Sequence, residues 1–311
     1  MGKLAFIFPG QGSQYVGMGK ELFLTPSGKR AKQTAHEILG NKLITLIEGG
    51  PEEELQQTAW TQPAILLVSV AAWQLLSEAG IEPDYVAGHS LGEYSAHVAA
   101  GSLHLAEALR MVRKRGELMQ AAVPSGGGMA AILGLSGELV EEACRRAAEH
   151  GVVAPANYNC PGQVVISGEV LAIAKAIEAA KELGAKRAIP LVVSGPFHSR
   201  LMEKVEEELL PILEGVTWNN PRCPIIANID AAEVITPKRI VSTLVKQVSS
   251  AVLWEQSVRH LLSLGVDTFI ECGPGKILTG LVKKIAPDVN LLHVEDMASL
   301  KKSLAYIKES R

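Results

Sequence analysis

Short apolar runs alternate with longer amphipathic stretches along most of the chain. Runs of strand length occur at residues 4–8, 85–87, 224–227, 268–272 and 290–294. Residues 62–79 are apolar nearly all round and end at Gly80, which is typical of a helix buried against a sheet. Short apolar strands separated by helices predict a parallel sheet covered on both faces. We therefore expect an α/β fold whose large domain is a parallel-sheet, α/β-hydrolase-like domain.

The segment 125–196 has a different order of elements. It reads as strand, helix, strand, strand, helix and strand, at 129–135, 137–151, 152–158, 163–168, 172–184 and 186–193. This βαββαβ order is typical of a ferredoxin-like unit, and the sequence SGGG at 125–128 is interpreted as a hinge. We expect a large α/β catalytic domain formed by 1–124 and 197–311, and a ferredoxin-like small subdomain formed by 125–196.

The composition is that of an ordinary globular protein. Of the 311 residues, 47% are hydrophobic and 20% are charged, which excludes a disordered chain. The net charge of −3 gives no support for nucleic-acid binding, and the four cysteines contain no CxxC pair that would suggest a zinc site. The longest apolar stretch, 63–76, is too short to span a bilayer. We expect a cytoplasmic protein that binds neither nucleic acid nor membrane and holds no metal.

Gly88-His89-Ser90-Leu91-Gly92 matches the pattern G-x-S-x-G. An apolar strand candidate precedes it and a helical run follows it, which places the serine hydroxyl at a sharp strand-to-helix turn. The N–H of Leu91 then points to where an oxyanion would develop. Taken alone, Ser90 is either a nucleophile or a small residue in a tight turn.

A nucleophilic serine needs a base. Among the eight histidines, His198 lies where the chain leaves the predicted subdomain, and loops between domains often carry catalytic groups. The alternative is a packed histidine without a catalytic role. No aspartate lies between Ser90 and His198, which disfavours the α/β-hydrolase order of serine, aspartate and histidine. A serine–histidine dyad with a neutral acceptor on the imidazole N–H fits better.

Arg115 lies on an apolar helix face between Met111 and Met119. Since a buried arginine needs a partner, two interpretations stay open. An internal glutamate pairs with it, or it binds a substrate carboxylate through two parallel hydrogen bonds.

The N-terminal loop FPGQGSQYVGMG is glycine-rich but matches neither of the common nucleotide-binding motifs. Tyr15 stands where a dinucleotide fingerprint needs its third glycine, and no Gly-Lys-Ser/Thr follows for a phosphate-binding loop. We expect the backbone amides of this loop and Gln11 to face the top of the sheet beside the serine.

The motifs FPGQGSQYVGMG, GHSLGEYSA, RGELMQ, GPFHSRLM and IECGPGKILTGLVKK, in this order, resemble malonyl-CoA:acyl carrier protein transacylases of bacterial type II fatty acid synthesis. The resemblance runs from Leu4 to about Ile285. It implies an acyltransferase that moves the malonyl group from malonyl-CoA to the phosphopantetheine thiol of acyl carrier protein through a malonyl-serine intermediate, in a ping-pong reaction. It implies no cofactor, and we expect a monomer.

The resemblance also assigns roles in the reaction. Ser90 would be the nucleophile and His198 its base. Arg115 would bind the free malonyl carboxylate. Phe197, directly before the histidine, resembles the pattern of malonyl-selective members and would belong to the substrate-binding site.

Further implied roles concern the backbone. The amides of Gln11 and Leu91 would form the oxyanion hole, and the backbone carbonyl of Gln247 would orient the histidine. That neutral acceptor agrees with the missing aspartate. The chain departs from the family at 250–252, where Ser-Ala-Val lacks a proline that the family often has.

Overall fold

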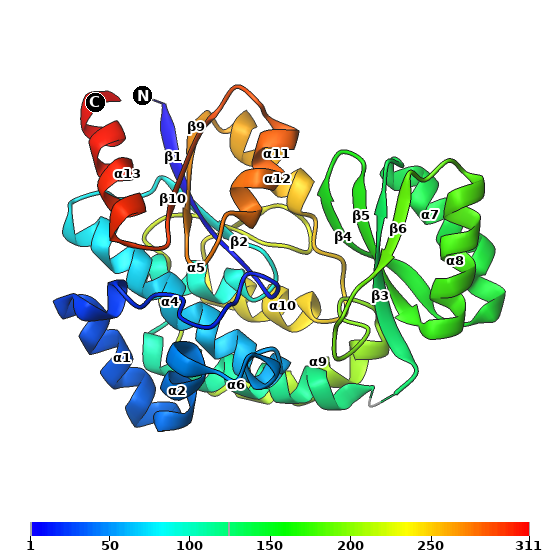
Figure 1. The fold of residues 1–311 in the computed structure, drawn as a ribbon, viewed down its shortest axis with the longest axis horizontal. Helices are drawn as coiled ribbons and strands as arrows, with labels where there is room; N and C mark the ends of the chain where they lie inside the picture. The colour runs from blue at the N-terminus through cyan, green and yellow to red at the C-terminus, as the bar shows by residue number, and fades with distance from the viewer. Residues whose placement is uncertain (1, 124, 311) are drawn as a thin grey trace.

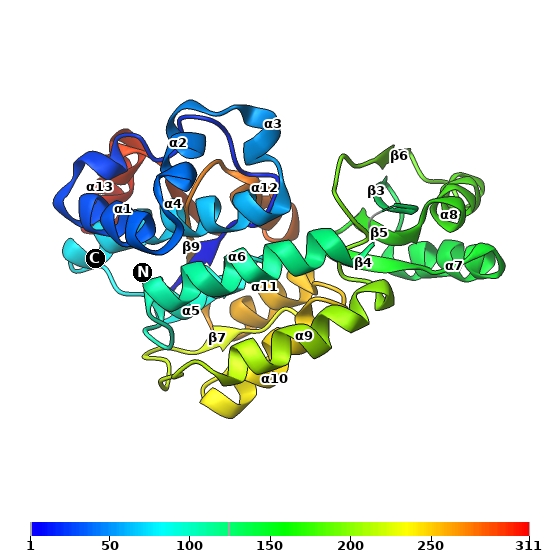
Figure 2. The same cartoon turned by 90° about the horizontal axis from the view of Figure 1, so that it is seen from below.

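The computed structural model describes residues 2–123 and 125–310. Met1, Pro124 and Arg311 lie outside the described residues. The predicted end of the segment 1–124 therefore also lies outside them. Within the described residues the chain forms two sheets, which lie side by side with helices around them (Figures 1 and 2).

The larger sheet has six strands in the described part of the chain. These are β1 (Lys3–Phe8), β2 (Tyr85–Gly88), β7 (Ile225–Ile226), β8 (Glu233–Val234), β9 (Val266–Cys272) and β10 (Asn290–Val294). Their spatial order is β10-β9-β1-β2-β7-β8, and all neighbours are parallel except β7 and β8. The apolar runs read from the sequence therefore form the parallel sheet that was predicted.

Helices cover both faces of this sheet. The helices of this lobe are α1 (Pro26–Leu39), α2 (Asn41–Gly49), α3 (Glu52–Leu55), α4 (Thr58–Glu78), α5 (Gly92–Ala99), α6 (Leu105–Ala122), α9 (Glu203–Glu214), α10 (Pro237–Gln247), α11 (Trp254–Ser263), α12 (Ile277–Ile285) and α13 (Met297–Ser310), with 3₁₀ turns η1 (Leu22–Leu24) and η3 (Arg200–Met202). Alternate residues of β1 enter opposite cores: Phe6 packs in the cluster with α4, α6 and α9, and Ile7 packs in the cluster with α11 and α12. A strand buried on both faces explains its continuous apolar sequence.

The smaller sheet is antiparallel and has the order β4-β5-β3-β6. Its elements are β3 (Gly127–Leu133), α7 (Gly137–Ala147), η2 (Ala148–His150), β4 (Val153–Cys160), β5 (Gln163–Glu169), α8 (Val170–Glu182) and β6 (Arg187–Pro190). They form the green lobe of Figure 1, which has a core of its own. The hinge predicted at 125–128 is wrong in its second half, because Gly127 and Gly128 pair with β5 as strand residues.

The two lobes are joined by main-chain hydrogen bonds. Val252, in the loop between α10 and α11, donates its N–H to the carbonyl of Ala156 at 2.8 Å and accepts from the N–H of Tyr158 at 2.9 Å. This loop therefore extends the edge of β4 by one bridge. The loop is thereby fixed relative to both lobes.

The long helix α4 is a core helix. By length and composition it could cross a membrane, but 78% of its most apolar stretch is buried inside the protein. At Gly116 helix α6 approaches α4 so closely that a Cβ would lie 2.7 Å from the carbonyl oxygen of Thr58. The glycine thus permits the approach that brings Arg115, its neighbour, next to Gln62 of α4.

Two glycines allow β2, the following turn and α5 to pack against β1. A Cβ on Gly88 would lie 1.9 Å from the carbonyl carbon of Gly92, and a Cβ on Gly92 would lie 2.0 Å from the carbonyl oxygen of Phe8. Since backbone atoms cannot move aside, neither position admits another residue. The turn that carries Ser90 is fixed by this packing.

Gly92→Ala is expected to lower the free energy of unfolding by about 3 kcal/mol or more, because the new methyl group meets backbone atoms of β1. Urea denaturation measures the change. Gly280→Ala is the control: it lies in helix α12 with open space around it and should stabilise the protein by about 0.5–1 kcal/mol. Equal stability of the Gly92→Ala variant and the wild type would contradict the packing argument.

Candidate active site

Ser90 occupies the turn between β2 and α5 with a φ of 52°, in the left-handed region that few non-glycine residues adopt. Asn228 holds this turn from both sides. Its Oδ1 accepts from the Ser90 N–H at 2.6 Å, and its Nδ2 donates to the carbonyl of Gly88 at 2.6 Å. The strained backbone therefore has dedicated partners and presents the serine side chain at the end of the strand.

The structure brings Ser90 and His198 together although 108 residues separate them. Ser90 Oγ lies 2.7 Å from His198 Nε2. His198 Nδ1 faces two backbone carbonyls, those of Gln247 at 2.8 Å and Ser250 at 3.2 Å. Because carbonyls only accept, Nδ1 carries the proton, and Nε2 is left to accept the proton of the serine hydroxyl. The acceptor is neutral, as the missing aspartate suggested.

The His198 imidazole is buried and uncharged. Burial, and next to it the positive charge of Arg115, lower the pKa of His198 to about 3. Its backbone, at a φ of 59°, is fixed by a hydrogen bond from its N–H to the carbonyl of Val248 at 3.1 Å. The imidazole is therefore available as a base over the whole neutral pH range.

Arg115 is 1% exposed and has neutral partners. Its Nη1 donates to Gln62 Oε1 at 2.8 Å, and its Nη2 donates to Gln247 Oε1 at 2.9 Å and to Ser90 Oγ at 3.2 Å. Among the described residues no carboxylate forms an ion pair with it, although the charge of Glu93 acts on it from a greater distance, and its Nε has no hydrogen-bond partner. The glutamate ion pair considered from the sequence is therefore not found, and the buried charge is available to a carboxylate.

A cavity of about 120 Å³ lies beside Ser90. The residues predicted for the site line it: Gln11, Ser90, Leu91, Arg115, Phe197 and His198. Among residues 2–123 and 125–310, the backbone amides of Gln11 and Leu91 donate to no protein acceptor. An oxygen bound in the cavity next to the serine can therefore accept from them, which is what an oxyanion hole requires.

The sequence reasoning missed three buried polar residues that support the site, namely Gln62, Glu93 and Asn228. Glu93 Oε2 accepts from Gln247 Nε2 at 2.8 Å and from the Asn228 N–H at 3.0 Å, and burial raises the pKa of Glu93 to about 7. Asn228 lies two residues after the end of strand β7. A polar residue at the carboxyl end of a parallel strand is a signal that could have found it.

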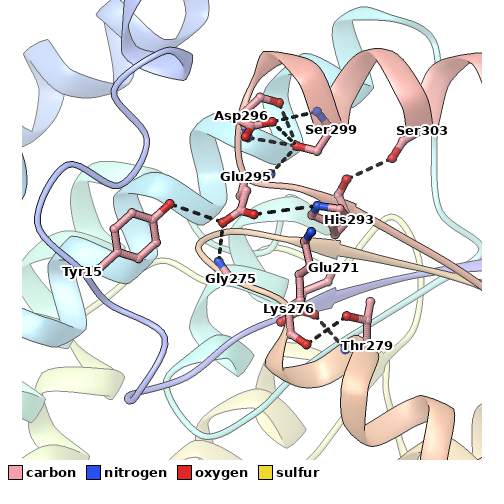
Figure 3. Close-up of polar contacts among 10 residues, drawn as sticks. All are labelled: Tyr15, Glu271, Gly275, Lys276, Thr279, His293, Glu295, Asp296, Ser299 and Ser303. Carbon is pink, nitrogen blue, oxygen red and sulfur yellow. Dashed lines mark hydrogen bonds and ion pairs between the residues drawn. The ribbon is translucent and has the colours of Figure 1, made fainter.

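A second polar cluster braces the N-terminal loop that carries Gln11 (Figure 3). The buried Glu271, at the end of β9, accepts from two backbone N–H groups in the first turn of α12, at 2.7 and 3.0 Å. Glu295 Oε2 accepts from the Gly275 N–H at 2.9 Å and from the Tyr15 hydroxyl at 3.3 Å. The IECGPGKILTG motif thus caps a helix and ties the turn before it to the loop of Gln11.

The chain resembles known proteins over nearly its full length. It matches the acyl transferase domain family over residues 5–302. It is 49% identical over 313 residues to the malonyl CoA-acyl carrier protein transacylase of Bacillus subtilis (strain 168), which covers 99% of this chain and 98% of that protein.

Solved structures have the same fold. An acyl carrier protein S-malonyltransferase from Vibrio cholerae O1 biovar eltor str. N16961 has a TM-score of 0.94 at 45% identity, covering 97% of this chain and 99% of that one. A type II PKS acyl-carrier protein in complex with its malonyl-transacylase, PlMCAT:AntF, has a TM-score of 0.95 at 43% identity, covering 98% and 99%.

The acylation of Ser90 is expected to stay at a constant rate from pH 8 down to about pH 5, because the lowered pKa of His198 keeps the imidazole neutral there. Mass spectrometry of samples quenched after mixing with an acyl thioester measures the rate, and circular dichroism at each pH checks the fold. A rate that falls by half near pH 6.5, the ordinary pKa of histidine, would contradict the prediction.

Proposed function

Because this chain belongs to the acyl transferase domain family and, within it, to the malonyl CoA-acyl carrier protein transacylases, we propose that it moves the malonyl group of malonyl-CoA to the phosphopantetheine thiol of acyl carrier protein. This is an acyltransferase reaction of fatty acid biosynthesis, and it uses no cofactor. One observation supports it above the others: the serine–histidine pair lines the same cavity as a buried arginine whose hydrogen-bond partners, within the described residues, are two amides and a hydroxyl.

In the first half-reaction Ser90 Oγ attacks the thioester carbonyl of malonyl-CoA while His198 Nε2 takes the hydroxyl proton. The carbonyl oxygen becomes an oxyanion and accepts from the amides of Gln11 and Leu91, each of which stabilises the transition state by roughly 3 kcal/mol. The C–S bond then breaks. The CoA thiolate leaves with the proton of His198, and a malonyl-serine ester remains.

The second half-reaction runs in the opposite sense. His198 Nε2 takes the proton of the carrier thiol, whose sulfur attacks the ester carbonyl. The same two amides stabilise the oxyanion. The bond to Ser90 Oγ breaks, the serine regains its proton from the imidazole, and the malonyl-carrier thioester leaves. Each product leaves before the next substrate reacts, so the kinetics are ping-pong.

Arg115 and Phe197 select the malonyl group. The substrate carboxylate takes the place of Ser90 Oγ as acceptor for Nη2 of Arg115 and also accepts from Nε, which has no partner among the described residues. A buried cation is costly unless it is paired with an opposite charge, and the other partners of Arg115 are neutral amides. A charged acceptor therefore stabilises it more than a neutral one does. Phe197, buried in the wall of the cavity, limits the room beside the acyl chain.

We also propose the finer description of the fold. The large domain, 1–124 and 197–311, is α/β-hydrolase-like, and 125–196 is an inserted ferredoxin-like subdomain. The strand order β4-β5-β3-β6 with two helices supports the second statement. The protein acts as a cytoplasmic monomer that binds neither nucleic acid nor membrane.

With labelled malonyl-CoA and holo acyl carrier protein, the label is expected on the carrier thioester and not in free malonate. Chromatography of the two products measures the ratio. Ser90→Ala should abolish the transfer, because no ester intermediate can form. Release of the label mainly as malonate in the presence of the carrier would instead indicate a thioesterase.

Arg115→Ala is expected to lower malonyl transfer by about a hundredfold, since two charge-assisted hydrogen bonds are lost, and to raise acetyl transfer relative to malonyl transfer. Steady-state kinetics with both acyl-CoA substrates measure the ratio. Arg110→Ala is the control, because this exposed arginine of the same helix pairs, within the part of the chain that the structure describes, only with Glu107. Malonyl transfer at the wild-type rate in Arg115→Ala would show that the arginine does not bind the carboxylate.

A further inference from the structure

The two carbonyls that orient His198 lie at a helix end. Helix α10 ends at Gln247, and Ser250 follows in a turn that belongs to no helix or strand. Carbonyls at the C-terminus of a helix have no partner within it. The position of the histidine therefore depends on whatever holds this turn.

Glu206 of α9 holds the turn from the side of the large lobe. Its carboxylate accepts from Lys246 Nζ at 2.5 Å and from the hydroxyl of Ser249, so it contacts the chain on both sides of Gln247. Glu206 is only 9% exposed, whereas Glu207 and the glutamate after it lie exposed on the same helix. Buried carboxylates are rare unless they are paired. The contacts with Lys246 and Ser249 provide such partners for Glu206.

The turn is fixed from the side of the small lobe as well. Beyond Ser250 and Ala251, the main-chain bonds of Val252 attach it to β4. Between these attachments lies Ala251, a residue that leaves the backbone dihedral φ free to vary. A proline would restrict the backbone covalently. In this chain the contacts of Glu206 supply a restriction at the same turn.

We propose that Glu206 is a positioning residue for the acyl transfer. Through Lys246 and Ser249 its carboxylate fixes the turn whose carbonyls keep His198 in the Nδ1–H tautomer, with Nε2 towards Ser90. This inference rests on the proposed role of His198 as the base.

A loosened turn affects the chemical step more than substrate binding. When the carbonyls shift, the imidazole loses its acceptors and rotates or changes tautomer, so that Nε2 no longer faces Ser90. Arg115 keeps Gln62 as a partner on another helix. The rate of malonyl-serine formation should therefore fall while the affinity for malonyl-CoA changes little.

Single-turnover acylation of the full chain by malonyl-CoA tests the proposal. Glu206→Ala is expected to lower the acylation rate roughly tenfold. This is a smaller loss than the roughly hundredfold loss of rate that can follow when a catalytic group is misplaced by about 1 Å. The apparent dissociation constant for malonyl-CoA should stay within about twofold. Glu206→Gln keeps an acceptor for Ser249 and should retain most of the rate.

Glu207→Ala is the matched control, because it removes the same side chain from the next position of the same helix, where it is exposed. It should acylate at the wild-type rate. Unfolding measurements on all variants separate a loss of stability from a loss of rate in the folded protein.

A spectroscopic readout distinguishes positioning from a merely structural role. In NMR spectra of protein labelled with ¹⁵N-histidine, His198 of the wild type should show a protonated Nδ1 and an unprotonated Nε2. Glu206→Ala should show a mixture of tautomers. A variant that is only less stable would keep the wild-type tautomer.

Ala251→Pro provides a rescue. The N–H of Ala251 donates to no acceptor within the described residues, so a proline removes no hydrogen bond. Added to Glu206→Ala, it should recover most of the lost rate. A folded double variant no faster than Glu206→Ala would count against the proposal.

Glu206→Ala that acylates at the wild-type rate with an unchanged tautomer would overturn the proposal. A wild-type protein that forms no malonyl-serine would instead refute the proposed function, because that result does not depend on Glu206. The two failures are therefore distinguishable in the same experiment.

Discussion

The candidate site depends on one residue, Gln247, and above all on the hydrogen bond that its backbone carbonyl accepts from His198. Its side chain has further partners in the same space: Oε1 accepts from Arg115, and Nε2 donates to the carbonyl of Ser90 and to Glu93. The serine, the histidine and the arginine come from three distant parts of the chain. They meet at this glutamine: the histidine at its backbone carbonyl, the serine and the arginine at its side chain.

A neutral acceptor on the histidine has an electrostatic consequence. An aspartate at the position of the Gln247 carbonyl would place a negative charge close to Arg115 and would compete with a substrate carboxylate for it. It would also raise the pKa of His198, which burial and Arg115 now lower. The amide partners carry no charge, and Glu93 interacts with the arginine without forming an ion pair among the described residues. A neutral carbonyl as the partner of His198 thus keeps the imidazole uncharged and leaves Arg115 able to bind a substrate carboxylate.

Much of this arrangement could be predicted from local sequence, and the limits have physical causes. The apolar runs predict β1, β2 and β9, and the glycines on both sides of Ser90 indicate the turn. Each of these patterns lies within a few consecutive residues. The partners of Arg115 could not be found, since Gln62 and Gln247 approach it only through helix packing. Glu206 gave no signal among neighbouring glutamates, because burial depends on the tertiary fold. Gly127 and Gly128 were misread as a hinge, since composition does not reveal that a partner strand exists.

The seam between the lobes at Val252 consists of backbone atoms on both sides. Hydrogen bonds between main chains do not depend on which side chains the residues carry. The small lobe can therefore diverge in sequence, and change the wall that it contributes to the cavity, without losing its attachment beside the histidine. Evolution, or an engineer who transplants the lobe from a relative, can vary the acyl specificity on one side of this seam while the nucleophile and its base stay unchanged on the other.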